Sequence, residues 1–508
     1  MSAKGTFLTP QIILATIALS LGSFMNILDM TIVNTAVSHI AGDFAVPYTQ
    51  GTWVITTYAV AEAIMLPLTG WLTQRFGMLK LFTISTILFT LASVLCGVST
   101  TMEMLLFARI LQGVVGASMI PLSQTLLMSI YPPDKRGMAI GLWAMTLVLA
   151  PIAGPILGGW LTDNANWRWA FYINIPLGIF VSLTTWMVFK KLSWKDVVVK
   201  APVDIIGIIL LVVGIGSLQL MLDKGSEHDW FNDSFIVSLA IISFIFMVIF
   251  VIWEKHQKNP IVDLKYFKDR NFVVGVLALA IGSTAFFATV VIIPIWLQNY
   301  LGYTAYDSGI TTATTSVFVV LLAPIIGANM HKFDSRKLVA FGFIAFFVGA
   351  YLGSNLTPDV TQGHVALTRL YIGVGLAFFF IPLNNILLAN IPDNEIAAAS
   401  GISNFMRNIG NSFGTSLVVS HFNTLQASYH EQLVSTVHTG NNNYNEVINN
   451  LGGATEQNMF YLNHIINGQA ALLGINNIIM LSGIIMLCLI PILFIAKKSD
   501  KVIEGAGH

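Results

Sequence analysis

The stretch "GSFMNILDMTIVN", residues 22–34, places a single acid, Asp29, inside an apolar run long enough to cross a membrane. A charged side chain at the centre of a bilayer costs at least a few kcal/mol unless it is paired or hydrated. Intramembrane carboxylates therefore tend to mark functional pathways, and Asp29 is the first candidate for such a residue.

The composition of the whole chain indicates a membrane protein. Of its 508 residues, 55% are hydrophobic and only 10% are charged, with a mean hydropathy of +0.75. A soluble domain normally carries about 25% charged residues, so this apolar surface needs a lipid environment. The net charge is zero and no basic patch or nucleic-acid motif is present, so we expect no nucleic-acid partner. The first apolar run has no small-residue cleavage site and is expected to be retained.

Cysteine and histidine give no sign of metal or redox chemistry. Cys96 and Cys488 both lie in apolar runs, where free cysteines are usually small core residues. The 10 histidines are scattered and make no metal-ligand spacing. We therefore expect no metal, no cofactor and no enzymatic activity.

Runs of about 20 mainly apolar residues predict transmembrane helices, and the chain has fourteen candidates. Most of the 25 Lys and Arg residues fall in alternate loops, which would be cytoplasmic if the N-terminus were. This bias predicts an all-α polytopic membrane protein with both termini in the cytoplasm. The expected spans are residues 11–33, 52–72, 81–99, 104–128, 138–160, 169–189, 204–222, 234–253, 272–297, 307–329, 337–355, 367–390, 399–420 and 475–496.

Three more charged residues lie well inside these spans: Glu62, Arg109 and Arg407. At a rise of 1.5 Å per residue, Asp29 and Arg109 would lie about 6 and about 8 Å from the same membrane face, so we expect them to meet. Such a pair is either static or a proton relay, and the rarity of intramembrane acids favours the relay. Glu62 is a second candidate proton or cation site, or else a carboxylate facing water.

Polar residues recur at helical spacing within the span 399–420 and predict one polar face. A polar face avoids lipid, so it either lines a cavity or bonds to another helix. The predicted substrate-cavity residues are Asn34, Gln112, Asn404, Arg407, Asn408 and Asn411.

Two further motifs are typical of helices and loops that change conformation in transporters. In "APIAGPILGGW" (150–160), two prolines bend the helix and three glycines permit a close approach of another backbone, as in a sealing surface or ordinary tight packing. In "GWLTQRFGMLK" (70–80), a short basic turn has a weaker counterpart at 327–337, and such internal repeats are typical of transporters. The named residues are Pro151, Gly154, Pro155, Gly158 and Gly159 in the first motif, and Gly70, Arg75 and Gly77 in the second.

Two connecting segments stand out by length. Residues 254–271 are charged and read as an amphipathic connector, whereas residues 421–474 form the one long loop on the non-cytoplasmic side. Its Asn- and Gly-rich centre predicts a loop, and its flanks are expected to be helices that extend beyond the membrane. It is either a tolerated insertion or a docking site.

Together these motifs resemble the fourteen-helix drug:proton antiporters of the major facilitator superfamily, and the similarity runs through the whole chain. The loop motif departs from the family at Gln74, where an Asp is usual, and the family motifs do not require Glu62. The matching segments are "LDMTIVNTA" (28–36), "GWLTQRFGMLK" (70–80), "RILQGVVGA" (109–117), "PIAGPILGGW" (151–160), "WRWAFYINIPLG" (167–178) and "SNFMRNIGNSFGTS" (403–416).

The resemblance implies two six-helix bundles that rock around a central cavity, with two inserted helices between them. It implies proton coupling through Asp29 and Arg109, export of lipophilic drugs, and residence in a bacterial inner membrane. It also implies a tripartite pump with a periplasmic membrane-fusion adaptor and an outer-membrane channel. The expected domains are a bundle at 1–190, inserted helices and connector at 191–265, bundle helices at 266–420, a periplasmic loop at 421–474 and a last helix with cytoplasmic tail at 475–508.

Two alternative functions stay open at this point. One is a carrier of the same fold for another solute, such as a lipid or metabolite exporter. The other is an uncoupled channel, although rings of like charge or a filter, which channels use, are not evident.

Overall fold

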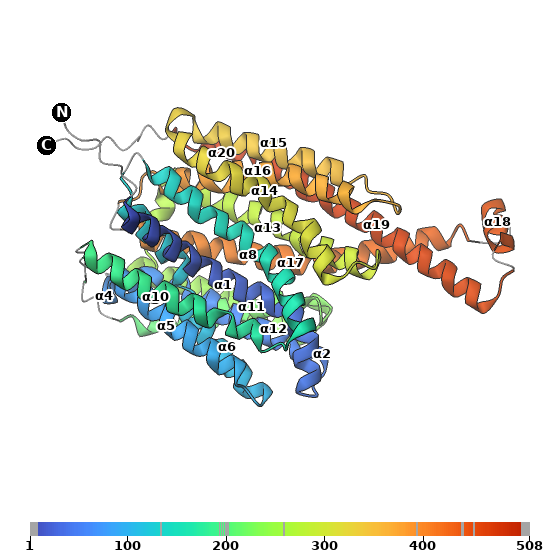
Figure 1. Ribbon diagram of the computed structural model, residues 1–508, viewed down its shortest axis with the longest axis horizontal. Helices are drawn as coiled ribbons and strands as arrows, with labels where there is room; N and C mark the ends of the chain where they lie inside the picture. Colours follow the sequence, from blue (N-terminus) through green and yellow to red (C-terminus); the bar gives the residue numbers. More distant parts are fainter. Residues whose placement is uncertain are drawn as a thin grey trace.

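The computed structural model describes residues 9–498, apart from 133–134, 193, 195, 197, 199–202, 258–259, 393–394, 438–440 and 451–452. Every regular element in this part of the chain is a helix, and the helices form one elongated bundle (Figure 1). Both the start of α1 and α20 lie toward one end, here called the terminal end. At the opposite end, the hairpin end, α17 and α19 project well beyond the other helices.

Ten helices are described in the first half of the chain. They are α1 (Pro10–Asp43), α2 (Tyr48–Gly51), α3 (Trp53–Met65), α4 (Thr69–Phe76), α5 (Met78–Gly97), α6 (Met102–Gly116), α7 (Met119–Ile130), α8 (Arg136–Asn164), α9 (Trp169–Tyr172) and α10 (Asn174–Lys191). The second half continues with α11 (Ile205–Gly225), η2 (Trp230–Asn232), α12 (Ser234–His256), η3 (Leu264–Lys268), α13 (Arg270–Asn299), α14 (Ala305–Asn329), η4 (Met330–Lys332), α15 (Ser335–Gly353), α16 (Gln362–Leu388), α17 (Ile396–Val434), α18 (Asn442–Asn450), α19 (Glu456–Cys488) and α20 (Ile490–Ile495).

By length and composition, 12 of the described helical segments can cross a membrane, and a thirteenth is the pair α3 and α4, bent by 63°. The remaining expected span is α17, which is 39 residues long but too polar to qualify. The fold class is confirmed, whereas the predicted count of fourteen spans is approached and not confirmed.

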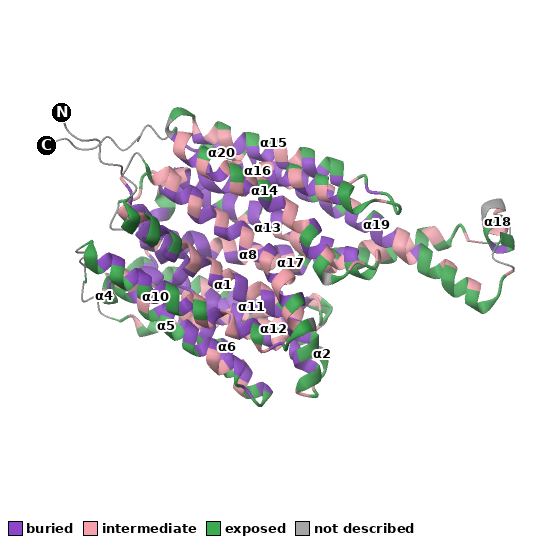
Figure 2. Ribbon diagram, in the orientation of Figure 1, coloured by how far each residue is buried: buried purple, intermediate pink, exposed green. Residues whose placement is uncertain are grey.

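The burial pattern is that of a protein surrounded by lipid. Large apolar side chains are exposed on the outer faces of the bundle, and Phe244 on α12 is 71% exposed. Polar residues such as Asp29 and Arg109 are buried between helices instead (Figure 2). In water this arrangement would be unfavourable, and in a bilayer it places apolar surface against acyl chains.

Helix packing divides the chain into two groups. In the first half α1 packs on α8 and α10, and α6 packs on α3 and α5; in the second half α16 packs on α14 and α15, and α17 packs on α13 and α19. The two groups meet where α8 lies along α14 and where α4 and α7 meet α17. The residue boundaries predicted for the domains remain predictions.

Small residues bring α8 and α14 into direct backbone contact. A Cβ atom on Gly137 would lie 2.2 Å from the carbonyl oxygen of Gly327, and one on Gly309 would lie 2.5 Å from Ile156. The first contact is at the terminal end and the second is toward the hairpin end, so this seam between the two groups is closed along its length.

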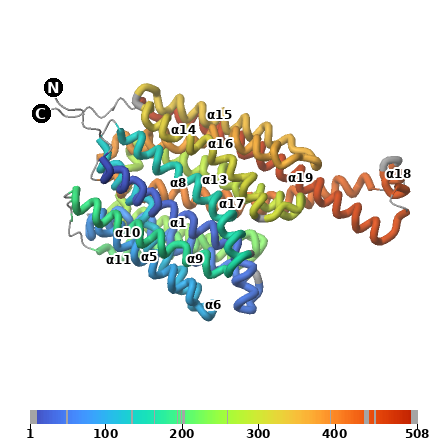
Figure 3. The backbone as a smooth tube through the Cα atoms, viewed as in Figure 1, coloured from blue at the N-terminus to red at the C-terminus, as the bar shows by residue number. Residues whose placement is uncertain are grey.

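The segment 421–474 is mostly helical where the structure describes it. Helix α17 continues to Val434, α19 begins at Glu456, and α18 lies between them at the tip of the projection (Figures 1 and 3). The expected helical flanks are therefore present as extensions of two long helices.

Candidate functional site

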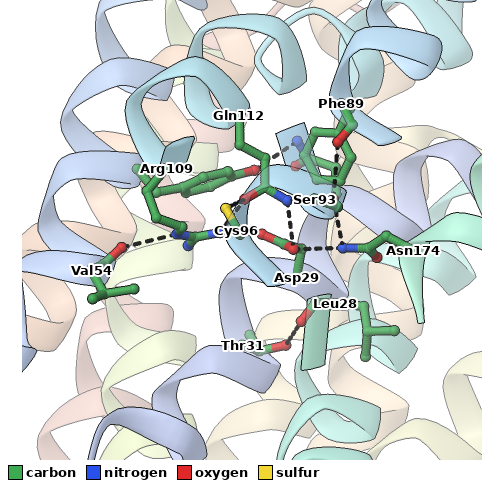
Figure 4. Close-up of polar contacts among 12 residues, drawn as sticks. Leu28, Asp29, Thr31, Val54, Phe89, Ser93, Cys96, Arg109, Gln112 and Asn174 are labelled. Atoms are coloured by element: carbon green, nitrogen blue, oxygen red, sulfur yellow. Dashed lines mark hydrogen bonds and ion pairs between the residues drawn. The ribbon is translucent and has the colours of Figure 1, made fainter. Parts of the chain in front are cut away.

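Asp29 lies at the centre of a buried polar cluster contributed by four helices (Figure 4). Arg109 Nη1 lies 2.5 Å from its Oδ2, and both side chains are 0% exposed. The other oxygen, Oδ1, accepts hydrogen bonds from Gln112 Nε2 at 2.8 Å and from Asn174 Nδ2 at 2.6 Å. The carboxylate is thus paired and hydrogen-bonded, as a buried charge requires.

Helix geometry explains how these groups reach one carboxylate. Arg109 and Gln112 are three residues apart on α6 and share one face of that helix. Asn174 comes from the start of α10, and Ser93 from α5 accepts from Gln112 at 2.8 Å and from Asn174 at 3.2 Å. Both amides are therefore held in place by a neutral hydroxyl as well as by Asp29.

Arg109 also has partners other than Asp29. Its Nε donates to the carbonyl oxygen of Val54 at 3.0 Å, its Nη1 donates to Gln112 Oε1 at 2.6 Å, and its guanidinium carbon lies 4.2 Å from the centre of the Tyr58 ring. If Asp29 became protonated, the guanidinium would keep two hydrogen bonds and a cation–π contact. Arg109 would therefore keep hydrogen bonds through Nε and Nη1 when Asp29 changed charge, whereas its Nη2 has no hydrogen-bond partner among the described residues.

Glu62 occupies a different place. It is 4% exposed on α3 and its carboxylate is hydrogen-bonded by Asn26, whose Nδ2 also donates to the Tyr58 hydroxyl at 2.9 Å. Glu62 and Arg407 attract each other across the two halves of the molecule, although they make no contact ion pair among the described residues. Arg407 is half-buried.

The predicted cavity residues separate into distinct environments. Gln112 does not line a cavity: it is fully buried in the Asp29 cluster, because its position one turn after Arg109 points it toward the same carboxylate. Asn34 is exposed on α1. Asn404 and Asn408 are buried, Asn404 donates to the Ser400 carbonyl at 2.8 Å, and Asn411 is half-buried.

The Pro–Gly motif of α8 packs on α1. A Cβ on Gly154 would lie 2.2 Å from Thr31 Oγ1, and a Cβ on Gly158 would lie 2.2 Å from Thr35 Oγ1. Pro151 and Gly159 are buried and Pro155 is half-buried. The glycines therefore permit a very close approach of α1, the helix that carries Asp29, to α8, the helix that meets the other half at α14.

The loop motif lies at the terminal end. A Cβ on Gly70 would lie 2.6 Å from that of Ala398 on α17, so this turn touches the other half. Gly77 has a φ of +85°, which favours glycine. Arg75 is half-buried with its guanidinium 5.9 Å from the centre of the Trp71 ring.

Gln74 is exposed where the family usually has an Asp, but another acid serves this loop. Asp196, from the segment after α10, accepts from the backbone of Leu79 at 2.9 Å and of Lys80 at 3.1 Å. It also accepts from Trp194 Nε1 at 3.1 Å. A carboxylate thus caps the first turn of α5 from a remote part of the chain.

Several polar residues of the site were not identified from the sequence. Asn174 and Ser93 belong to the Asp29 cluster, and Asp223, Lys224 and Arg369 lie within helices that can span the membrane. The sequence could have identified them, because any polar residue inside an apolar span is a candidate for function.

Comparison with known proteins identifies the family. Residues 19–415 match the model of the Major Facilitator Superfamily. The chain belongs to the major facilitator superfamily. It is therefore a multi-pass membrane transporter of this superfamily, as its motifs predicted.

Relatives of similar length resemble the chain from end to end. Multidrug export protein EmrB of Haemophilus influenzae is 42% identical over 490 residues, which is 96% of each chain. Multidrug export protein EmrB of Escherichia coli strain K12 is 41% identical over 501 residues, 98% of each chain. Fatty acid resistance protein FarB of Neisseria gonorrhoeae is 41% identical over 497 residues, 97% of each chain.

Solved structures confirm the major facilitator fold. The proton:xylose symporter XylE superposes with a TM-score of 0.56 at 14% identity, covering 94% of this chain and 96% of that chain. At this level of identity the similarity shows the fold alone.

Proposed function

We propose that the protein is a proton-driven multidrug exporter, a drug:proton antiporter that works by alternating access. The observation that carries this proposal is the fully buried pair of Asp29 and Arg109, in which each partner has alternative contacts. Intramembrane acids with such surroundings commonly act as proton relays.

The coupling step follows from the geometry of the cluster. A proton on Asp29 cancels the attraction of Arg109, while Gln112 and Asn174 keep their hydrogen bonds to Ser93. The carboxyl group is then free to separate from α6, and α1 is free to move relative to it. Loss of the proton restores the ion pair, so the charge of Asp29 selects between two arrangements of α1.

The substrate is proposed to enter between the two halves, where Glu62 on α3 attracts Arg407 on α17. The polar face of α17, which includes Asn404, Asn408 and Asn411, would line this path. A lipophilic cation bound near Glu62 would compete electrostatically with protonation of the nearby acids, which links drug binding to proton release.

The relatives support export of lipophilic compounds. Two of them are named multidrug export proteins, and a third is named a fatty acid resistance protein. That third name favours one second candidate, a lipid-type exporter of the same fold. Both candidates use the same proton-coupling site and differ in the substrate.

We further propose that the terminal end faces the cytoplasm of a bacterial inner membrane and the hairpin end faces the periplasm. The projecting helices α17 and α19 would then meet a periplasmic membrane-fusion adaptor (EmrA-like) that leads to an outer-membrane channel (TolC-like). Apolar side chains are exposed on this projection: Phe460 is 76% exposed and Tyr461 is 53% exposed. Such exposed aromatic groups favour a protein contact.

The transport proposal is tested in proteoliposomes with an imposed proton gradient and ethidium, a lipophilic cationic dye. We expect wild-type protein and the control variant Asp43→Asn to accumulate the dye. Asp43 lies on α1, as Asp29 does, but it is exposed and pairs with Arg168. We expect Asp29→Asn to lose gradient-driven accumulation but to retain exchange of labelled dye at equilibrium. Equal accumulation by Asp29→Asn and wild type would refute the proposal, and a fatty acid in place of the dye tests the second candidate.

The adaptor proposal is tested by adding one negative charge to the projection. Phe460→Glu should reduce capture of the adaptor, whereas Gln457→Glu, at an exposed polar position one turn away, should not. Unchanged adaptor capture by Phe460→Glu, together with capture by a protein lacking residues 425–470 that still inserts correctly, would exclude the projection as the docking site.

A further inference from the structure

Helix α11 of the inserted pair lies between the two halves of the transporter. It packs against α3 on one side and α17 on the other, whereas α3 and α17 make little direct contact. Gly216 faces α3, since a Cβ there would lie 3.5 Å from Ile64 Cδ1, an ordinary van der Waals distance. An inserted helix that only enlarged the bundle would be expected to face lipid and not to separate its halves.

Hydrogen bonds fix α11 to one face of α17. Gln219 Nε2 donates to Ser412 Oγ at 2.7 Å, Ser416 Oγ donates to the carbonyl oxygen of Leu222, and Trp230 Nε1 on η2 donates to Ser420 Oγ at 3.0 Å. The three serines are four residues apart and therefore line one stripe of the helix.

A second set of contacts fixes α11 to α3. Lys224 is buried, with its side chain 3% exposed, and its Nζ donates to Thr52 Oγ1 and to Glu227 Oε2, each at 2.8 Å. The same Nζ lies 5.1 Å from the centre of the Trp53 ring. These contacts hold a cation at the hairpin end of α3.

Asp223 stands between these two sets of contacts. Its Oδ1 accepts from Gln219 Nε2 at 3.0 Å, and its carboxylate also accepts from the Thr56 hydroxyl on α3. Because the two hydrogens of the Gln219 amide go to Asp223 and to Ser412, one continuous chain joins α3 to α17 through this carboxylate. Asp223 is half-buried.

We propose that Asp223 is a second proton-coupling residue and that its charge controls a latch between α3 and α17, made by Gln219 and Ser412. This inference rests on the proposed proton-driven function. When Asp223 is charged, it holds the Gln219 amide nitrogen and so directs its second hydrogen to Ser412. When Asp223 is protonated, it becomes a donor that favours the oxygen of the Gln219 amide, and the bond to Ser412 is lost.

The charged groups that act on Asp223 are known from the structure. They are Lys224 and Glu227, which belong to the same segment, while the groups that contact it or Gln219 from α3 and α17 are the hydroxyls of Thr56 and Ser412. A neutral surrounding on both partner helices makes the charge of Asp223 the variable that changes the latch.

The test follows the distance between spin labels at His39 on α1 and Asn423 on α17, both exposed near the hairpin end, in a background with Cys96→Ser and Cys488→Ser. In wild type we expect the population with the longer distance to grow as the pH falls from about 8 to about 5, since protonation opens the latch. Asp223→Asn should show the longer distance throughout this range, and Asp223→Glu should restore the pH response. Ser412→Ala removes only the hydrogen bond between Gln219 and α17 and should increase the open population at high pH by about tenfold.

Dye-export assays distinguish the proposed latch from the proposed role of Asp29 in proton-driven export. Asp223→Asn and Ser412→Ala should lower the maximal rate of dye export by about tenfold, with little change in the dye concentration at half-maximal rate. A pH response of Asp223→Asn identical to wild type, in a protein that still transports, would overturn the latch while leaving Asp29 as the coupling site. If Asp29→Asn transported normally but Asp223→Asn did not, the proposed role of Asp29 would fail and the latch would stand.

Discussion

The two halves of the molecule carry an arginine at matching positions, in opposite surroundings. The segment "ARILQGVVG" (108–116) on α6 resembles "TRLYIGVGL" (368–376) on α16, and Arg109 and Arg369 occupy the same place in each. Arg109 is 0% exposed and Arg369 is 3% exposed. Both are buried cations in the middle of a bundle.

Among the described residues, only the first of these two arginines forms an ion pair with an acid. Arg109 and Arg369 are 260 residues apart (369 − 109), and the same separation pairs Asp29 with Thr289 on α13. Thr289 is 2% exposed and donates to the Phe286 carbonyl at 2.9 Å. The Nε and Nη2 atoms of Arg369 have no hydrogen-bond partner among the described residues. The comparison indicates that the buried acid, and not the arginine, distinguishes the first half from the second, and the proposed mechanism assigns proton coupling to that first half.

Removal of Arg109 tests this difference most strongly. Arg109→Leu should destabilise the protein by about 3 to 5 kcal/mol, because it leaves Asp29 buried without a cation. The measurement is thermal unfolding in detergent, with transport assayed in parallel. The double variant Arg109→Leu with Asp29→Asn is the matched control and should recover part of the stability; a single variant as stable as wild type would contradict the role of the pair.

Gly→Ala substitutions at matching helix contacts should destabilise both halves to a similar extent, in contrast to substitutions of the two arginines. Gly154 on α8 has its counterpart at Gly414 on α17, where a Cβ would lie 2.5 Å from the Thr284 carbonyl oxygen. Gly154→Ala and Gly414→Ala should each cost about 1 to 3 kcal/mol through overpacking. Gly363→Ala is the control, since a Cβ there meets nothing within 4 Å. The three variants are compared with wild type by thermal unfolding. Equal destabilisation by Gly363→Ala would show that the cost does not come from overpacking, and no cost for Gly154→Ala would contradict equal packing in the two halves.

Arg369 should behave in the opposite way to Arg109. Arg369→Leu removes a buried charge that no acid compensates, so stability should stay the same or rise by about 1 kcal/mol, with dye transport retained. Arg369→Lys keeps the charge and should not raise stability. Unfolding of Arg369→Leu as severe as that of Arg109→Leu would mean that the second arginine has an essential partner.

The smallest expected effect concerns the repeated loops at the terminal end. Asp334 accepts from the backbone of Arg336 at 3.0 Å and pairs with its guanidinium at 2.7 Å, and these hydrogen bonds hold the pKa of Asp334 below its usual value of 3.8. Its stabilisation is therefore present above about pH 4 and is lost as the pH falls further. Asp334→Asn should cost about 0.5 to 1 kcal/mol at neutral pH by thermal unfolding. The cost should become smaller as the pH falls below about 4; a cost independent of pH would exclude the charge as its source.

Much of the site was predictable because charges are rare in apolar spans. Asp29 and Arg109 stood out for that reason, and the structure joins them. Their depths in the membrane stay predictions, whereas α1 is longer than expected: it continues to Asp43 and places Asp29 nearer the middle of the helix. Hydropathy finds where a helix is apolar and not where its hydrogen bonding ends.

What was missed depends on contacts distant in the sequence. Asn174 reaches Asp29 from 145 residues away, and no spacing within either helix indicates that meeting. Asp223 and Lys224 lie just past the expected end of their span at 222, although α11 continues to Gly225. Such pairings follow from the packing of helices against one another, which a single sequence does not specify.

The central claim is that the charge of Asp29 couples drug binding to protons. The direct measurement is proton release on addition of ethidium to the purified protein in lightly buffered detergent solution, from about pH 6 to about pH 9, for wild type and Asp29→Asn. The account predicts release from wild type and none from Asp29→Asn, with ethidium still bound by both. Release from Asp29→Asn equal to that from wild type would contradict it and would direct attention to Glu62.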